Sequence, residues 1–268
     1  MAVTLATTYH DANDRMYAQI ARVLPTLTHL FAGIAVQASS RAPERSLSLL
    51  AHAGATIQRD DPDQSGGAAR LGTARRRALT LALHQNTPLL LFFDFDSLLH
   101  WADHYPDELA AVLAQLSQHD MTILGRTERA FLSHPQSQRA TEALVNQLFA
   151  HLTGAAWDVM RSGRGLSRRA AETIVRESHD DGISTDVTWP LLLLRHGGFS
   201  ISSIAVEGTE FETQDRYQPE VITAGGQERW LEQLDRDPRR WAHRFTLARM
   251  HAEAMIPFAG PTTHVEAT

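Results

Sequence analysis

The sequence contains no cysteine and no lysine. The absence of cysteine excludes disulfides, thiolate metal sites and a cysteine nucleophile. The absence of lysine excludes Schiff-base chemistry and the phosphate-binding lysine of a Walker motif. All 25 basic residues are therefore arginines. We attribute this composition to genomic bias, because function rarely bans lysine everywhere.

The sequence also lacks a membrane-spanning run and an excess of positive charge. No apolar run reaches the roughly 18 residues that span a bilayer. The N-terminus, MAVTLATTYHDAND, lacks the charged region and apolar core of a signal peptide. We therefore expect a cytoplasmic protein. The formal net charge is −6 and the arginines are scattered, so no nucleic-acid partner is predicted.

Apolar segments rich in β-branched residues alternate with helical patterns along the 268 residues. The patterns predict a helix that begins near Asp11 or Asn13 and ends near Pro25, and they leave the glycine- and arginine-rich residues 154–169 irregular. This alternation predicts an α/β sheet with helices on both faces. Strands are predicted at 3–9, 29–36, 54–58, 88–94, 121–124 and 199–206, and further helices at 43–53, 68–84, 106–119, 137–152, 168–178, 186–195 and 227–255, the last broken at Pro238.

The segment PLLLFFDFDSLLHW, residues 88–101, ends a buried strand with Asp94 and Asp96. Buried carboxylates are costly unless they are paired or bound to something. One interpretation is that they cap the next segment and face solvent. Ligands of open α/β sheets bind at the carboxyl ends of strands, and two oxygen ligands there suit Mg²⁺ or Mn²⁺.

A second interpretation is a phosphatase of the haloacid dehalogenase type, in which Asp94 is the nucleophile. Thr127 would then belong to the second motif of that family, and Asp181 with Asp186 to its acidic metal motif. The order of the motifs argues against it, because the Asp-x-Asp strand normally opens that domain and three predicted strands precede it here.

The order instead fits a nucleotide-sugar glycosyltransferase. Over about residues 3–217 the chain resembles mannosylglycerate synthase and related retaining GT-A enzymes, in four blocks that fall in sequence order. The resemblance implies a GT-A-like, mostly parallel α/β sheet over residues 1–226. Residues 1–126 would be the nucleotide-binding half, 127–226 the acceptor half, and 227–268 a C-terminal helix with a loose tail. It also implies transfer of a hexose from a nucleoside diphosphate sugar to a small hydroxylated acceptor, with retention.

The first two blocks imply contacts to the donor. The turn after the first strand, with Thr7, Tyr9 and His10, would contact the base and ribose. The second block, residues 67–79, carries a glycine-rich turn before a helix, where backbone amides and Arg70 would bind the diphosphate. Asp60, after the third strand, could bind the base or ribose. Residues 75–77 are all arginine, and most of them are expected to be solvated because they cannot all face one ligand.

The third block and the end of the fourth imply a metal site. The resemblance assigns Asp96 as the main ligand of Mg²⁺ or Mn²⁺ and lets Asp94 contact the ribose or the metal. The family places a histidine a few residues after a Glu-Gly pair, but the stretch that follows residues 207–208 has none. Either Glu210 or Glu212 replaces that histidine, or the third ligand is absent.

The rest of the fourth block implies an acceptor site. Asp186 matches the acidic residue that faces the acceptor, and it would orient or deprotonate the acceptor hydroxyl. The glycine turn that contains Gly165 would shape the sugar pocket, and Trp189 would be either a ligand contact or a packing residue.

Three expectations remain open at the level of the sequence. His100 and His104 follow the Asp-x-Asp, so they could reach its metal or lie in an exposed loop. The C-terminal helix, with two tryptophans, could pack on the domain or form a homodimer surface. The missing histidine leaves a non-catalytic sugar-nucleotide binding protein as an alternative.

Overall fold

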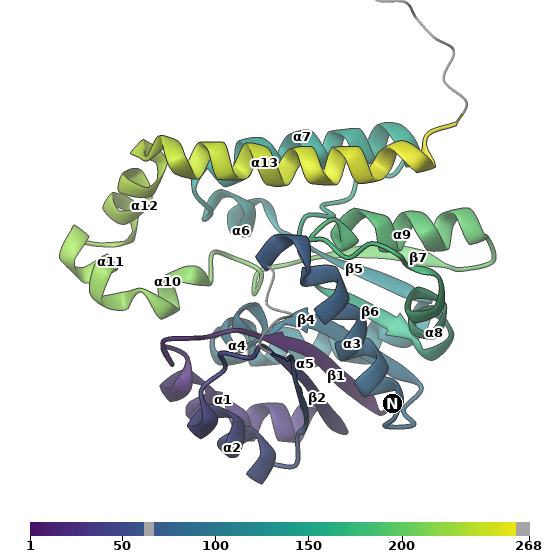
Figure 1. Cartoon of the computed structure of the whole chain (residues 1–268), viewed down its shortest axis with the longest axis horizontal. Helices are drawn as coiled ribbons and strands as arrows, with labels where there is room; N and C mark the ends of the chain where they lie inside the picture. The colour runs from purple at the N-terminus through teal and green to yellow at the C-terminus, as the bar shows by residue number, and fades with distance from the viewer. Residues whose placement is uncertain (62–66, 261–268) are drawn as a thin grey trace, which may run out of the picture.

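The structure is a computed structural model that describes residues 1–61 and 67–260 (Figure 1). Part of the expected loose tail, residues 261–268, lies outside the described residues. The remaining chain forms one α/β sheet with helices on both faces, as the alternation of patterns predicts.

The described strands form a seven-stranded sheet in the order β3-β2-β1-β4-β6-β5-β7. Strand β6 runs antiparallel to its neighbours β4 and β5, whereas the other neighbouring pairs are parallel. The mostly parallel sheet of the expected fold class is therefore confirmed. The bounds are β1 Val3–Tyr9, β2 Gly33–Ala38, β3 Thr56–Arg59, β4 Leu89–Asp94, β5 Met121–Arg126, β6 Arg164–Ser167 and β7 Ile201–Val206.

Helices cover both faces of this sheet. One face carries α1 Tyr17–Leu30, α2 Glu44–His52, α4 Phe95–His104 and α5 Pro106–Gln115. The other carries α3 Leu71–Leu83, α7 Gln136–Thr153, α8 Arg168–Glu177 and α9 Thr185–His196. The short helix α6 Glu128–Leu132 follows β5. After β7 an arch of α10 Thr213–Arg216, α11 Gln218–Ala224 and α12 Gln227–Arg236 leads to α13 Pro238–Met255, which lies along α7 (Figure 1). Among the described helices, none combines the length and apolarity needed to cross a bilayer.

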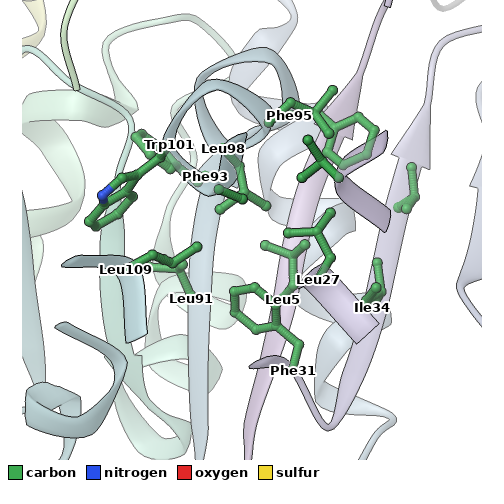
Figure 2. Close-up of a cluster of buried hydrophobic side chains, with 14 of the residues drawn as sticks. Leu5, Leu27, Phe31, Ile34, Leu91, Phe93, Phe95, Leu98, Trp101 and Leu109 are labelled. Atoms are coloured by element: carbon green, nitrogen blue, oxygen red, sulfur yellow. The ribbon is translucent and has the colours of Figure 1, made fainter. Parts of the chain in front are cut away.

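Strand β4 supplies side chains to both cores. Leu91 and Phe93 join the cluster on the α1 and α4 face, which also contains Leu5, Leu27 and Trp101 (Figure 2). The alternate residues of β4, Leu90 and Phe92, join the opposite cluster. This alternation follows from the two-residue period of a strand, and its double burial explains the uninterrupted apolar run in the sequence.

Several expected element boundaries are wrong. Helix α1 begins at Tyr17 and not near Asp11 or Asn13. Helix α1 continues through Pro25 to Leu30 and takes residues that the sequence assigns to a strand, so β2 begins at Gly33. Pro25 cannot bond to the carbonyl of Ala21, but both residues lie on the exposed face, where water can reach that carbonyl. Residues 95–104, expected as strand end and loop, form α4. Residues 164–167, expected to be irregular, form the central strand β6.

The glycines of the irregular-looking segment allow β6 to pack in the middle of the sheet. A Cβ atom on Gly165 would lie 2.3 Å from a methyl group of Leu116, and one on Gly163 would lie 3.0 Å from Leu124 and Phe93. The Arg164 side chain is buried and donates to four backbone carbonyls, including those of Val159 and Asp186. Close packing therefore explains glycine here.

A buried ion pair joins β5 to the segment that precedes β6. Nε and Nη2 of Arg126 donate to the Asp158 carboxylate at 2.7 and 2.8 Å, and Nη1 donates to Glu142 at 2.6 Å. Burial alone would raise the pKa of Asp158, but Arg126 and Asn146 lower it to about 2. The pair therefore stabilises the fold most when Asp158 is ionised.

We predict that this pair is lost in acid. Because the folded-state pKa lies below the ordinary value of 3.8, the contribution of Asp158 is complete above about pH 4 and falls by about 2 kcal/mol as the pH drops to 2. Urea unfolding of the wild type and Asp158→Asn should differ most at pH 7, and the difference should shrink by about that amount at pH 2. An undiminished difference at pH 2 would contradict the assignment.

Candidate functional site

The carboxyl end of β4 lies where the order of the sheet reverses, because β1 leads outward through β2 and β3 while β4 begins the other half. Ligands of open α/β sheets bind at such a point. Asp94 ends β4 at this edge, and its carboxylate accepts a hydrogen bond of 2.9 Å from the Thr8 hydroxyl of β1. The Asp-x-Asp motif therefore begins where a ligand site is expected.

A hollow opens at this edge, and we call it the strand-end hollow. It is lined by residues at or just after the ends of β1 to β4, by the start of α3 and by Arg216 of α10. Far-separated predicted residues meet here, which supports a single ligand site. The predicted contacts that line it are Tyr9, His10, Asp60, Arg70, Asp94 and Asp96.

The polar groups of the strand-end hollow are held by neighbours. His10 Nδ1 lies 3.0 Å from the Ser39 hydroxyl, and Asp60 accepts a hydrogen bond of 2.8 Å from Gln37. In α3 the amides of Gly72 and Thr73 donate to the carbonyl of Asp181. An anion at this helix start would therefore meet the exposed side chain of Arg70 rather than these two amides.

Arg75 is one of the site residues that the sequence interpretation missed. Its guanidinium is buried and bridges two carboxylates, Asp94 at 2.8 Å and Asp186 at 2.7 Å. It also donates to the Thr185 hydroxyl at 2.8 Å. The expectation that most arginines of the run 75–77 are solvated fails for Arg75, because it lies on the face of α3 that packs on the sheet.

A second hollow, the helix-side hollow, lies across the Asp-x-Asp from the first. Its walls come from α7, α9, the segment before β6 and α13, and they include Asp186, Arg161, Arg244 and His251. Asp94 and Asp96 line this hollow too, so the two carboxylates form a wall shared by both hollows.

Asp186 is buried at the helix-side hollow. Burial raises its pKa, but Arg75 and His251 outweigh that effect and bring it to about 2. His251 Nε2 of α13 lies 3.5 Å from Asp186 Oδ2, while His251 Nδ1 contacts the Leu247 carbonyl at 2.7 Å. The C-terminal helix is therefore part of the site and holds the predicted catalytic carboxylate.

Asp96, in the first turn of α4, pairs with Arg216 at 2.8 Å. Burial raises the pKa of Asp96, Arg216 lowers it, and the charges of Glu212 and Asp94 raise it again, for a net rise. The carboxylate therefore sits in a place where further positive charge would stabilise its ionised form.

The two alternatives for the third metal ligand occupy different places. Glu212 lines the helix-side hollow beside Asp96 and pairs with Arg161 at 3.2 Å. Glu210 contacts His100 at 3.1 Å and pairs with Arg129 at 2.6 Å. Of the two, Glu212 is the one that faces the Asp-x-Asp.

Oxygen ligands from Asp94, Asp96 and Glu212 suit a hard divalent ion in their chemistry, but in this structure their carboxylate oxygens do not all lie within 4.8 Å of one another. Burial, together with the charges of Glu212 and Asp94, raises the pKa of Asp96, so a bound cation would favour the ionised carboxylate. Each of these carboxylates forms an ion pair with an arginine. The pairs are Arg75 with Asp94, Arg216 with Asp96 and Arg161 with Glu212. An ion would therefore compete with the arginine that pairs with Asp96.

Three predicted contact residues line neither of the two hollows in the described part of the chain. The Thr7 hydroxyl donates to the Phe93 carbonyl at 2.7 Å and ties β1 to β4. Gly165 packs under Leu116 in β6. Trp189 is buried with its ring edge-on to Phe92. Thr7 and Gly165 therefore serve the packing of the sheet instead of a ligand, and Trp189 takes the packing role that was one of its two expected alternatives.

Of the residues in the phosphatase interpretation, Asp186 lies near Asp94, but Thr127 and Asp181 do not join them. The Thr127 side chain accepts a hydrogen bond from the Ala130 amide and caps α6. Asp181 is 64% exposed and pairs with Arg76. Each of these two residues has a local structural role.

Solved structures of glucosyl-3-phosphoglycerate synthase from Mycobacterium tuberculosis share this fold. One is 11% identical in sequence, with a TM-score of 0.59 over 98% of this chain and 82% of that chain. Another, with Mn²⁺, uridine diphosphate and glucosyl-3-phosphoglycerate, is 13% identical, with a TM-score of 0.53 over 76% of this chain and 70% of that chain. A third, with Mn²⁺, uridine diphosphate and phosphoglyceric acid, is 12% identical, with a TM-score of 0.54 over 85% and 78%.

No protein-family profile matches the sequence, and no curated protein matches it either. The similarity is therefore one of fold at low sequence identity. It confirms the GT-A fold that the four sequence blocks imply.

Proposed function

We propose that this protein is a glycosyltransferase that moves a hexose from a nucleoside diphosphate sugar to a small hydroxylated acceptor, with retention of the anomeric configuration. The observation that carries the proposal is the wall shared by the two hollows. Asp94 and Asp96 border both, so a donor on one side and an acceptor on the other would meet at these carboxylates.

The donor nucleotide belongs in the strand-end hollow. His10 offers a ring and polar edges for a base, and Asp60 lines the same hollow for a base or ribose hydroxyl. Tyr9 also borders this hollow, but its side chain is buried against Phe95. Arg70 and Arg216 line the same hollow and offer charge-assisted hydrogen bonds to a diphosphate. The structural neighbours that hold uridine diphosphate make uracil the first base to test.

The acceptor belongs in the helix-side hollow. Arg161 and Arg244 line it, so an acceptor that carries an acidic group would be recognised by charge. One structural neighbour holds phosphoglyceric acid, and an acceptor of that chemistry, a small hydroxy acid, is the first to test.

Asp186 orients the acceptor hydroxyl. Its pKa of about 2 keeps the carboxylate ionised at neutral pH, where it accepts a hydrogen bond from a hydroxyl. An efficient general base has a pKa nearer the working pH, so orientation is the stronger of the two roles considered for Asp186. Arg75 and His251 hold it in position.

Asp94, Asp96 and Glu212 would hold a Mg²⁺ or Mn²⁺ ion. When bound, the ion would neutralise the charge of the departing diphosphate. Arg216 of α10 lines the strand-end hollow, so its guanidinium would also lie near the diphosphate. In this structure it pairs with the Asp96 carboxylate.

Three expectations remain predictions of this proposal. They are the cytoplasmic location, a homodimer through the C-terminal helices, and the division into a nucleotide half and an acceptor half. The acceptor half must be extended beyond residue 226. Arg244 and His251 of α13 line the helix-side hollow, so part of residues 227–268 would belong to the acceptor site.

A thermal-shift screen of nucleoside diphosphates with and without Mn²⁺ tests the proposal. At saturating concentrations one nucleotide, with uridine diphosphate tested first, should raise the melting temperature by about 5 °C or more. Arg70→Ala should reduce that shift, whereas Arg249→Ala, an exposed arginine of α13, should leave it unchanged. Absence of any shift with every nucleotide, with and without Mn²⁺, would contradict a donor site.

A further inference from the structure

His100, His104 and Asp215 form a cluster outside the two hollows. The two histidines lie one turn apart on α4, and Asp215 comes from α10. One ligand atom from each residue lies within 4.8 Å of the other two, and in residues 1–61 and 67–260 this is the one group of three histidine or carboxylate side chains that meets this condition. Asp215 Oδ2 lies 2.7 Å from His100 Nδ1 and 4.0 Å from His104 Nε2.

These separations suit a tetrahedral transition metal. With ligand bonds of about 2.0–2.1 Å, ligand atoms in a tetrahedral zinc site lie roughly 3.3–3.4 Å apart. The two separations to Asp215 bracket this value. The two imidazole rings have their centroids 4.5 Å apart, so small side-chain rotations would bring the three atoms to one ion.

The residues around the cluster are arranged as they are around metal ligands in other proteins. A metal-binding histidine generally gives its second ring N–H to a carboxylate or carbonyl. His100 Nε2 lies 3.1 Å from Glu210 Oε1, which leaves Nδ1 directed at Asp215. Gln19 donates to Asp215 Oδ2 at 2.9 Å and orients that carboxylate. Glu210 and Gln19 therefore fix the ligand atoms from outside.

We propose that His100, His104 and Asp215 bind a divalent transition metal, with Zn²⁺ as the best fit. Two imidazoles and one carboxylate select zinc and its neighbours over Mg²⁺, which prefers oxygen ligands alone. The His100 side chain is buried, while that of His104 is 50% exposed, so a fourth position is open to water. This site is separate from the Asp94 and Asp96 wall and does not depend on the proposed reaction.

The bound ion would fasten α10 to α4. Asp215 immediately precedes Arg216, whose guanidinium pairs with Asp96 and lines the strand-end hollow. The segment between β7 and α11 would thus be held at Asp215 by the ion and at Arg216 by the Asp-x-Asp. The ion would therefore fix the position of an arginine that borders the strand-end hollow.

Calorimetric titration of the metal-stripped full-length protein with Zn²⁺ alone tests the proposal. We expect one equivalent to bind, and we expect His104→Ala and Asp215→Asn each to weaken its affinity at least tenfold. His243→Ala removes an exposed histidine of α13 outside the cluster and should leave the affinity unchanged. Circular dichroism should show that His104→Ala is folded, because its side chain is half exposed.

A second probe separates this site from the Asp-x-Asp. Co²⁺ should give the visible absorption of a histidine-ligated ion in the wild type and lose it in His104→Ala, and excess Mg²⁺ should not displace it. No tight Zn²⁺ binding by the wild type, or binding that His104→Ala leaves unchanged, would overturn the proposal.

Discussion

Replacing Asp96 with asparagine is expected to lower turnover of the sugar-nucleotide donor about 100-fold or more, a loss typical of removing one charged group that stabilises a transition state. Asp96 borders both hollows and holds Arg216, so the variant loses the charge at the point where donor and acceptor meet. The fold should survive, because asparagine keeps an oxygen for the Ser97 amide, which donates to Asp96 at 2.9 Å. Steady-state release of nucleoside diphosphate measures the effect.

The matched control for this experiment lies on the same helix. Asp103 of α4 also pairs with an arginine, Arg22, but lines neither of the two hollows in the described part of the chain. Asp103→Asn should leave turnover within about twofold of the wild type, because exposed ion pairs contribute little. Equal losses in the two variants would show that Asp96 acts through the stability of α4.

Replacing Arg75 with methionine is expected to cost about 3–5 kcal/mol of unfolding free energy, because it leaves two carboxylates without their buried partner. Asp94 and Asp186 both depend on this guanidinium, whose side chain is 3% exposed. Urea denaturation at pH 7 measures the loss. The loss should be smaller near pH 4, because protonation then relieves the stranded carboxylates.

Arg77→Met, two residues along α3, is the control. Arg77 pairs with Asp60 at 2.8 Å, and its side chain is 35% exposed, so we expect a loss of about 1 kcal/mol or less. A cost below about 1 kcal/mol for Arg75→Met would contradict the bridging role of Arg75.

Much of the fold follows from local patterns in the sequence. The alternating residues of 3–9 match β1 residue for residue, and Pro238 begins α13 as the predicted break in the C-terminal helix. Proline lacks an amide donor and fits the first turn of a helix. Local chemistry of this kind is readable from one sequence.

The missed elements depend on tertiary contacts. Gly163 and Gly165 resemble a loop in sequence, but their lack of a Cβ lets β6 pack against Leu116, Leu124 and Phe93. The apolar residues after Asp94 could continue a strand or begin a helix, and packing in the core selects helix α4. Single-sequence patterns cannot separate these cases because the deciding atoms lie far along the chain.

The site residues also fall into those that a local sequence pattern indicates and those that only the tertiary fold brings together. The motif at the end of β4 indicated Asp94 and Asp96, and helical spacing could have indicated Arg75, which lies three residues from Ala78 and four from Leu79 on the buried face of α3. The four-residue spacing of His100 and His104 was a comparable signal for the metal cluster. Arg161, Arg216, Arg244 and His251 had no such signal, because the folding of distant segments alone brings them to the hollows.

The most direct test of the central claim is mass spectrometry of the products formed from uridine diphosphate glucose and small hydroxy acids, with Mn²⁺ present. The account predicts release of uridine diphosphate together with a glycosylated acceptor, and loss of both products in Asp96→Asn. If no nucleoside diphosphate sugar is turned over, even by slow hydrolysis, and the Asp94 carboxylate instead becomes phosphorylated by a phosphate ester, the glycosyltransferase account is contradicted.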